Sequence, residues 1–208
     1  MKIVILANGE FPKRKELLWE LQNAPFLIAC DGAVRHLHQL EISPDVVVGD
    51  LDSIPPALKH QYPTIHIQEQ ESNDLSKAFF YGLQQGGDEF VILGATGKRE
   101  DHSIANIFLL QHYYQYCKNI KIKSDFGIFG IYFTPFEIPT SIGQQISLFS
   151  LTPTMPLSSR GLKYPLKRLC LSHLFMGSLN EASQNSFALE ADAPTGVIVY
   201  QKHQDILE

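Results

Sequence analysis

The sequence predicts an α/β fold, in which an N-terminal Rossmann-like parallel sheet flanked by helices is followed by a C-terminal antiparallel β-sandwich. Two observations lead to this prediction. Up to about residue 124, short continuous apolar runs alternate with segments of helical spacing, the pattern of strands buried on both faces of a parallel sheet. Beyond that point the apolar runs are separated by proline and glycine, and helical spacing nearly disappears.

The first half of the chain contains six candidate strands with helices between them. The helix after Asn73 is the clearest, because its apolar residues lie three or four positions apart on one stripe. Other helices are expected to open near Pro12, at Val34 and at Ile104, the last being long and mostly buried. The strands are expected at residues 3–6, 26–30, 46–48, 65–67, 90–93 and 120–123.

The second half reads as short strands only, and either a small sandwich or a barrel fits this pattern. The change near residues 122–128 predicts two domains, residues 1–124 and residues 125–208. The strands are expected at residues 128–133, 146–151, 169–174, 186–189 and 197–200.

The composition excludes several classes of protein. The 208 residues are enough for one large or two small domains, and 44% hydrophobic with 19% charged residues is typical of a globular chain. A formal net charge of -5 argues against nucleic acid as the main partner. No apolar stretch approaches the length of a membrane span, and the first apolar run is too short for a signal peptide. We therefore expect a cytoplasmic protein without membrane contact.

Aspartates follow several of the candidate strands. Asp31 comes directly after one strand, and Asp50 and Asp52 come after the next. Because parallel strands deliver the residues that follow them to one edge of the sheet, these carboxylates can converge there. Side chains at i and i+2 of an extended loop point the same way, so Asp50 and Asp52 can hold one Mg²⁺ or flank two. The simpler interpretation is a turn whose aspartates bond local amides.

Two further motifs add to this edge. Asp74 lies at the start of the helix after Asn73, where capping alone would also explain it. The strand at 90–93 runs into a small basic loop, in which Lys98 and Arg99 and the free N–H groups of a helix start suit phosphate oxygens. The loop is not a P-loop, since the required glycine and lysine spacing is missing. Hard oxygen ligands beside basic side chains predict a magnesium-bound polyphosphate.

Taken together, the motifs resemble those of bacterial thiamine pyrophosphokinases in order and spacing across nearly the whole chain. The matching elements are Asp31-Gly32, Gly49-Asp50-Leu51-Asp52-Ser53, Asp74 with Lys77, Gly94-x-x-Gly97-x-Arg99-x-Asp101-His102 with Asn106, Gly161-x-Lys163-Tyr164-Pro165-Leu166 and Asn180-Glu181.

The resemblance implies an activity and a set of site residues. The implied enzyme is a thiamine diphosphokinase, which transfers a pyrophosphoryl group from ATP to the thiamine hydroxyl and leaves AMP. Residues 1–124 would bind ATP and Mg²⁺, and residues 125–208 would bind thiamine and join a homodimer. The implied catalytic residues are Asp31, Asp50, Asp52, Asp74 and Asp101, with Asp50, Asp52 and Asp74 as metal ligands. The implied ATP contacts are Ser53, Thr96, Lys98, Arg99, His102 and Asn106, and the thiamine contacts are Ser178 and Asn180.

Three positions depart from the family pattern. Lys98 stands where family members usually have glycine, Asn73 where they often have threonine, and Leu179 where serine commonly precedes the Asn-Glu pair. Three other functions also fit parts of the chain: a pyrophosphokinase of a pterin alcohol, a metal-dependent nucleotide hydrolase, and a non-catalytic nucleotide-binding sensor. The motifs of the second half favour thiamine.

Overall fold

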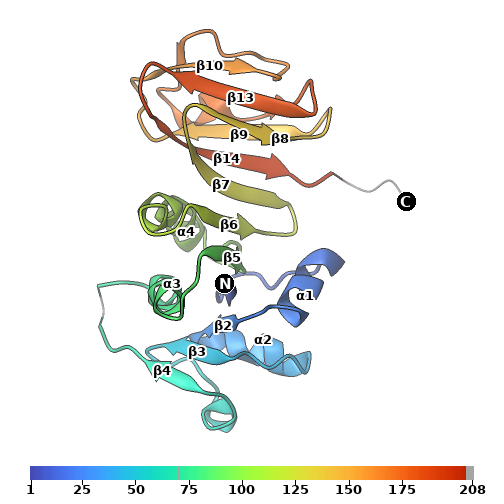
Figure 1. The fold of residues 1–208 in the computed structure, drawn as a ribbon. Helices are drawn as coiled ribbons and strands as arrows, with labels where there is room; N and C mark the ends of the chain where they lie inside the picture. The colour runs from blue at the N-terminus through green and yellow to red at the C-terminus, as the bar shows by residue number, and fades with distance from the viewer. Residues whose placement is uncertain (70, 205–208) are drawn as a thin grey trace. The chain divides into compact units, whose positions relative to one another are not determined.

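The computed structural model describes residues 1–69 and 71–204, and the chain divides into two compact units, Met1–Asp125 and Phe126–Glu208 (Figure 1). The last four residues of the expected second domain lie outside the described residues. Each unit has its own hydrophobic core. No helix among the described residues is long and apolar enough to cross a membrane.

The first unit is built on a parallel sheet, as predicted. Its strands lie in the order β6-β5-β1-β2-β3-β4, and every neighbouring pair is parallel. Because the strands are parallel, all of their carboxyl ends lie at one edge of the sheet. The strands are β1 (Lys2–Leu6), β2 (Leu27–Cys30), β3 (Val46–Gly49), β4 (Thr64–His66), β5 (Glu89–Leu93) and β6 (Asn119–Lys123).

Helices cover both faces of this sheet (Figure 1). On one face, Val4 and Leu6 of β1 share a core with Leu17 and Leu37, from α1 (Lys15–Gln22) and α2 (Val34–Gln39). The alternate side chains of the sheet point to α3 (Asp74–Gln84) and α4 (Glu100–Tyr113), where the Phe79 and Tyr113 rings stack at 4.1 Å. The continuous apolar strands are explained by this double coverage.

The prediction that the last of these helices is mostly buried was wrong. On α4 the buried side chains are Asn106, Leu110 and Tyr113, which recur every three or four residues on one stripe. Ile104 keeps 61% of its surface exposed, so the outer face of the helix carries apolar side chains as well. A helix with apolar residues all round was mistaken for a buried one.

The second unit consists of antiparallel strands. One group lies in the order β12-β9-β14-β7 and the other in the order β11-β10-β13-β8. Both groups contribute side chains to one core, including Ile146, Phe187 and Val197. The strands are β7 (Gly127–Phe133), β8 (Phe136–Pro139), β9 (Gln145–Ser150), β10 (Pro156–Arg160), β11 (Leu169–Cys170), β12 (Asn180–Glu181), β13 (Ser186–Ala191) and β14 (Gly196–Lys202).

Sequence patterns were less informative in this unit. The strand expected at residues 169–174 ends at Cys170, and a 3₁₀ helix follows at Leu174–Gly177. Strands β8, β10 and β12 were not predicted. β10 has the sequence Pro-Leu-Ser-Ser-Arg with a single apolar residue buried, and it is held by backbone pairing to β13. Pairing of this kind leaves no hydrophobic pattern to read.

Candidate active site

Three aspartates meet at the carboxyl edge of the parallel sheet. Asp31 follows β2, Asp50 follows β3, and Asp74 is the first residue of α3. One carboxylate oxygen from each lies within 4.8 Å of the other two. The convergence expected from the order of strands is therefore present for these three residues.

Local backbone geometry holds the three carboxylates in place. Asp31 has a positive φ of 29° and begins a 3₁₀ turn, and its Oδ2 accepts a hydrogen bond from the Ser53 N–H at 3.1 Å. A Cβ on Gly49 would lie 2.9 Å from the Asp31 Cβ and 3.1 Å from Asp74 Oδ1. Gly49 is therefore required for space, because any side chain there would push the carboxylates apart.

The third carboxylate is fixed by the start of α3. The Asn73 side chain caps this helix by accepting a hydrogen bond from the Ser76 N–H at 2.9 Å. One turn later, Lys77 is only 5% exposed, and its Nζ lies 3.4 Å from Asp74 Oδ1. A buried ammonium group therefore offsets part of the negative charge of the cluster.

Burial and mutual repulsion raise the pKa of two of these acids. Burial raises the pKa of Asp31 to about 6, and the charges of Asp74 and Asp50 add to the effect. Burial also raises the pKa of Asp74, although Lys77 opposes this shift. Asp50 differs, because hydrogen bonding from the Asp52 backbone lowers its pKa. Packing several carboxylates so closely is costly unless a cation joins them.

The cluster fits a hard divalent cation such as Mg²⁺. Asp31 is 3% exposed, and its Oδ1 is buried with no hydrogen-bond partner among the described residues. A buried carboxylate oxygen without a hydrogen-bond partner, on a residue whose carboxylate lies close to two others, matches the oxygen ligands that Mg²⁺ prefers. The residues present therefore suit the metal that the sequence motifs suggest.

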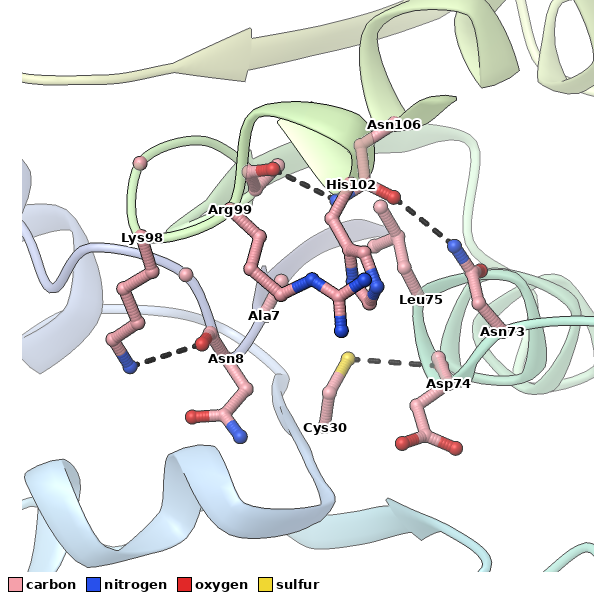
Figure 2. Close-up of a pocket in the computed structure, with 13 residues that line it drawn as sticks. Ala7, Asn8, Cys30, Asn73, Asp74, Leu75, Lys98, Arg99, His102 and Asn106 are labelled. Atoms are coloured by element: carbon pink, nitrogen blue, oxygen red, sulfur yellow. Dashed lines mark hydrogen bonds between the residues drawn. The ribbon is translucent and has the colours of Figure 1, made fainter. Parts of the chain in front are cut away.

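A cavity of about 360 Å³ adjoins the cluster, and Asp74 belongs to both. It opens between the ends of β1, β2 and β5 and the starts of α3 and α4 (Figure 2). Its lining residues are Ala7, Asn8, Gly9, Cys30, Asn73, Asp74, Leu75, Ala95, Gly97, Lys98, Arg99, His102 and Asn106. The cavity is therefore acidic at one side and basic at the other.

The basic side of the cavity is the loop between β5 and α4. Lys98 adopts a left-handed conformation with φ of 60°, and its Nζ donates a hydrogen bond to the Asn8 carbonyl at 3.0 Å. The left-handed backbone favours glycine, which is what the resembling family usually has at this position. Arg99 donates two hydrogen bonds to the Asp101 carboxylate and holds the pKa of Asp101 at about 2.

Several predicted site residues lie around the cavity, and others do not. Lys98, Arg99, His102 and Asn106 line it. Asp101 is exposed, forms an ion pair with Arg99 and accepts a hydrogen bond from the His102 N–H. It is not part of the three-carboxylate group. Asp52 accepts a hydrogen bond from the Ser53 hydroxyl at 3.1 Å and is also outside that group. Thr96 contributes its backbone carbonyl to the Glu10 N–H.

The two thiamine-contact residues predicted in the second unit differ in their surroundings. Asn180 is buried and bonds both the N–H and the carbonyl of Tyr164, so its amide orders that loop. The Ser178 hydroxyl donates to the Phe175 carbonyl at 2.7 Å. Between them, Leu179 is highly exposed and left-handed, with φ of 58°.

Sequence reasoning missed several residues that line the cavity, among them Asn8, Gly9 and Cys30. Asn8 and Gly9 follow β1 and Cys30 ends β2, so the rule that singled out Asp31 applied to them too. They carry no charge, which is why they did not stand out. The Cys30 thiol donates to the Asp74 carbonyl at 3.6 Å, and burial raises its pKa well above the usual value.

Two family models match most of the chain. The thiamin pyrophosphokinase catalytic domain matches residues 17–123, and the thiamin pyrophosphokinase substrate-binding domain matches residues 127–200.

Named relatives agree with the family models. A thiamine pyrophosphokinase of Bacillus subtilis is 31% identical over 187 residues, which cover 85% of this chain and 85% of that protein. Thiamine pyrophosphokinase 1 of Oryza sativa subsp. japonica is 25% identical over 205 residues, covering 82% of this chain and 75% of that protein.

Solved structures share the fold. A thiamin pyrophosphokinase family protein from Enterococcus faecalis superimposes with a TM-score of 0.82 at 22% identity, covering 99% of this chain and all of that one. Yeast thiamin pyrophosphokinase superimposes with a TM-score of 0.77 at 16% identity, covering 96% of this chain and 86% of that one.

Proposed function

The chain belongs to the thiamin pyrophosphokinase family, whose members are ATP-dependent diphosphotransferases, and we propose that the carboxylate cluster and the adjoining cavity are its catalytic centre. The observation that carries this assignment is the position of Asp74. It belongs at once to the group of three carboxylates and to the lining of the cavity that carries Lys98 and Arg99. A metal held by the cluster and phosphates held by the basic loop would therefore meet at one residue.

The geometry supports Asp31, Asp50 and Asp74 as the residues that hold Mg²⁺. Their oxygens lie within 4.8 Å of one another, and the unpaired Asp31 Oδ1 gives the cluster an open ligand position. The sequence-based choice of Asp52 in place of Asp31 stays a prediction. When bound, Mg²⁺ would neutralise charge on the ATP phosphates as the β-phosphorus is attacked.

The cavity residues would bind and orient ATP. Lys98 and Arg99 place two cations on one side of the cavity, and cationic side chains form strong hydrogen bonds with phosphate oxygens. Ser53, Thr96 and His102 stay predicted contacts. For Arg99 the ion pair with Asp101 must rearrange or be shared before its guanidinium can bind phosphate.

The reaction requires a base as well as a cation. The thiamine hydroxyl oxygen forms a bond to the β-phosphorus, the bond from that phosphorus to the bridging oxygen breaks, and AMP leaves with the bond's electron pair. A carboxylate must accept the hydroxyl proton. Asp31 and Asp101 are the candidate acceptors. In the metal-free site Asp101 is the weaker base, because Arg99 holds its pKa at about 2, whereas burial raises the pKa of Asp31 to about 6.

The two units would have different roles. We propose a Rossmann-like catalytic domain at residues 1–124 and a β-sandwich at residues 125–208 that binds thiamine and joins a homodimer in the cytoplasm. The match of the substrate-binding domain model to residues 127–200 supports this division. Exposed Leu174, Phe175 and Leu179 lie close in sequence to Ser178 and Asn180, and apolar surface of this kind suits a ligand or a subunit contact.

Product analysis tests the proposed function. The protein should form AMP and thiamine diphosphate from ATP and thiamine in the presence of Mg²⁺. A pterin alcohol offered in place of thiamine, or water alone, should yield little AMP. AMP formation that is equally fast without thiamine would identify a nucleotide hydrolase, and binding of ATP without any product would identify a sensor.

A further inference from the structure

Asn106 joins two parts of the candidate active site. Its Nδ2 donates a hydrogen bond to the Ala95 carbonyl at 2.8 Å, and its Oδ1 accepts one from Asn73 Nδ2 at 3.0 Å (Figure 2). The side chain is 8% exposed. Both ends of the amide are therefore bonded within the protein.

Each partner of Asn106 controls a different functional group. Ala95 belongs to the loop that continues to Lys98 and Arg99, which face the cavity. Asn73 caps α3 through its Oδ1, and the next residue is the cluster carboxylate Asp74. A chain of side-chain hydrogen bonds thus runs from the basic loop to the start of the helix that presents Asp74.

We propose that Asn106 is a positioning residue that couples metal binding to nucleotide binding. The inference rests on the proposed function. Transfer to the β-phosphorus requires the phosphates, held by the loop, and the metal, held by the carboxylates, to keep a fixed separation. A buried amide that donates at one end and accepts at the other is suited to fix that separation, since an unpaired buried polar group would be costly.

The residue type at position 106 follows from these two bonds. Aspartate could accept from Asn73 but could not donate to the Ala95 carbonyl, and leucine could do neither. Asn106 was expected from sequence to contact ATP directly. Because both ends of its amide are already bonded, the structure favours an indirect role.

A second link between the same helices provides a matched control. Farther along α3 and α4, the Ser76 hydroxyl and the Tyr113 hydroxyl form a buried hydrogen bond of 2.8 Å. The variant Tyr113→Phe removes one buried bond between the helices, as breaking the Asn73–Asn106 bond does. This bond involves neither the basic loop nor the Asn73 side chain, and Tyr113→Phe leaves the Ser76 N–H free to donate to the Asn73 cap.

The test compares nucleotide affinity with and without metal in the full chain. α,β-Methylene-ATP lacks the bond that is cleaved, so its Kd can be measured by calorimetry without turnover, in EDTA and in Mg²⁺. The variant Asn73→Thr keeps a side-chain oxygen for the cap but removes the donor to Asn106. In the wild type, Mg²⁺ should lower the Kd of the analogue. In Asn73→Thr this Mg²⁺ effect on the Kd should be smaller by a factor of at least about five, the scale of a typical coupling between sites. The quantity compared is the ratio of the Kd in EDTA to the Kd in Mg²⁺, and Tyr113→Phe should keep the wild-type ratio.

Three results would overturn the inference and leave the proposed function standing. The first is a full Mg²⁺ effect in Asn73→Thr, and the second is an equal loss in Tyr113→Phe, which would indicate general loosening of the helices. The third comes from Asn106→Leu combined with Asn73→Thr. The double variant should lose no more coupling than Asn106→Leu alone, and additive losses would show that the two residues act separately. If the wild type itself binds the analogue equally well with and without Mg²⁺, the proposed function fails, and the inference fails with it.

Discussion

At the scale of single residues, the buried carboxyl group of Asp31 lowers the stability of the metal-free folded protein at neutral pH. Its pKa is raised to about 6 from an ordinary value near 3.8, so between these pH values the folded protein binds more protons than the unfolded chain does. Stability of the metal-free protein should therefore fall as the pH rises through this window. The loss should be on the order of 2–3 kcal/mol and should persist above pH 6.

The variant Asp31→Asn should remove this pH-dependent loss of stability. In EDTA at pH 8 we expect it to melt at a higher temperature than the wild type, and the difference should disappear near pH 4. Added Mg²⁺ should raise the Tm of the wild type and have little effect on the variant. Asp101→Asn is the control. Because the pKa of Asp101 is lowered and not raised, removing this carboxylate should not increase the Tm. Identical pH profiles for Asp31→Asn and the wild type would contradict the explanation.

Asp74 and Asp50 should be needed for turnover but not for folding. Asp74→Asn and Asp50→Asn should each lower kcat/KM by at least about 100-fold, the scale expected when a group that stabilises transition-state charge is lost. Far-UV circular dichroism should be unchanged, because Asn73 caps α3 and Asp74 does not. Asp192→Asn, at an exposed pair with Arg168, serves as the control. Near-normal activity of either variant at ordinary Mg²⁺ concentrations would remove that residue from the metal site.

At the scale of elements, the loop between β5 and α4 combines strain with charge at Lys98. A residue that carries a side chain loses about 1–2 kcal/mol of stability in the left-handed backbone conformation. Glycine avoids this strain but loses about 0.5–1 kcal/mol through the greater entropy of the unfolded chain. Lys98→Gly should therefore keep or slightly raise the Tm, while the KM for ATP rises several-fold because a cation is lost from the cavity.

Lys98→Ala separates the two effects. It loses the same charge but keeps the left-handed backbone strain, so it should match Lys98→Gly in the KM for ATP and melt at a lower temperature. An unchanged KM in both variants would mean that Lys98 serves only its bond to the Asn8 carbonyl.

The sequence predicted the elements of the first unit well because those strands are buried on both faces. Runs such as Ile3–Leu6 and Val46–Val48 have no other good interpretation, and parallel order then brings Asp31 and Asp50 to one edge. Short strands such as β10 and β12 were not predicted, because they are defined by backbone pairing and not by a pattern of apolar residues. The Asn73–Asn106 bond joins residues 33 positions apart through rotamers, which no spacing rule reveals.

At the scale of the whole molecule, the predicted thiamine contacts Ser178 and Asn180 lie in the part of the chain that the substrate-binding domain model matches. The family resemblance implies a homodimer whose thiamine sites combine residues of both subunits. Sedimentation at micromolar concentration should then show a dimer. Asn180→Ala should raise the KM for thiamine more than that for ATP, because Asn180 orders the Tyr164 loop through both of that residue's backbone groups.

Co-expression of two defective variants tests the shared site directly. If each site takes Asp74 from one subunit and Asn180 from the other, a mixed dimer of Asp74→Asn and Asn180→Ala has one site with both defects and one intact site. Random pairing makes half of the dimers mixed, so the mixture should reach about a quarter of wild-type activity at low thiamine concentration, where either variant alone is nearly inactive. If each subunit completes its own site, every site in the mixture carries one defect. Activity would then stay at the mean of the two separate variants, and the site would lie within a single chain.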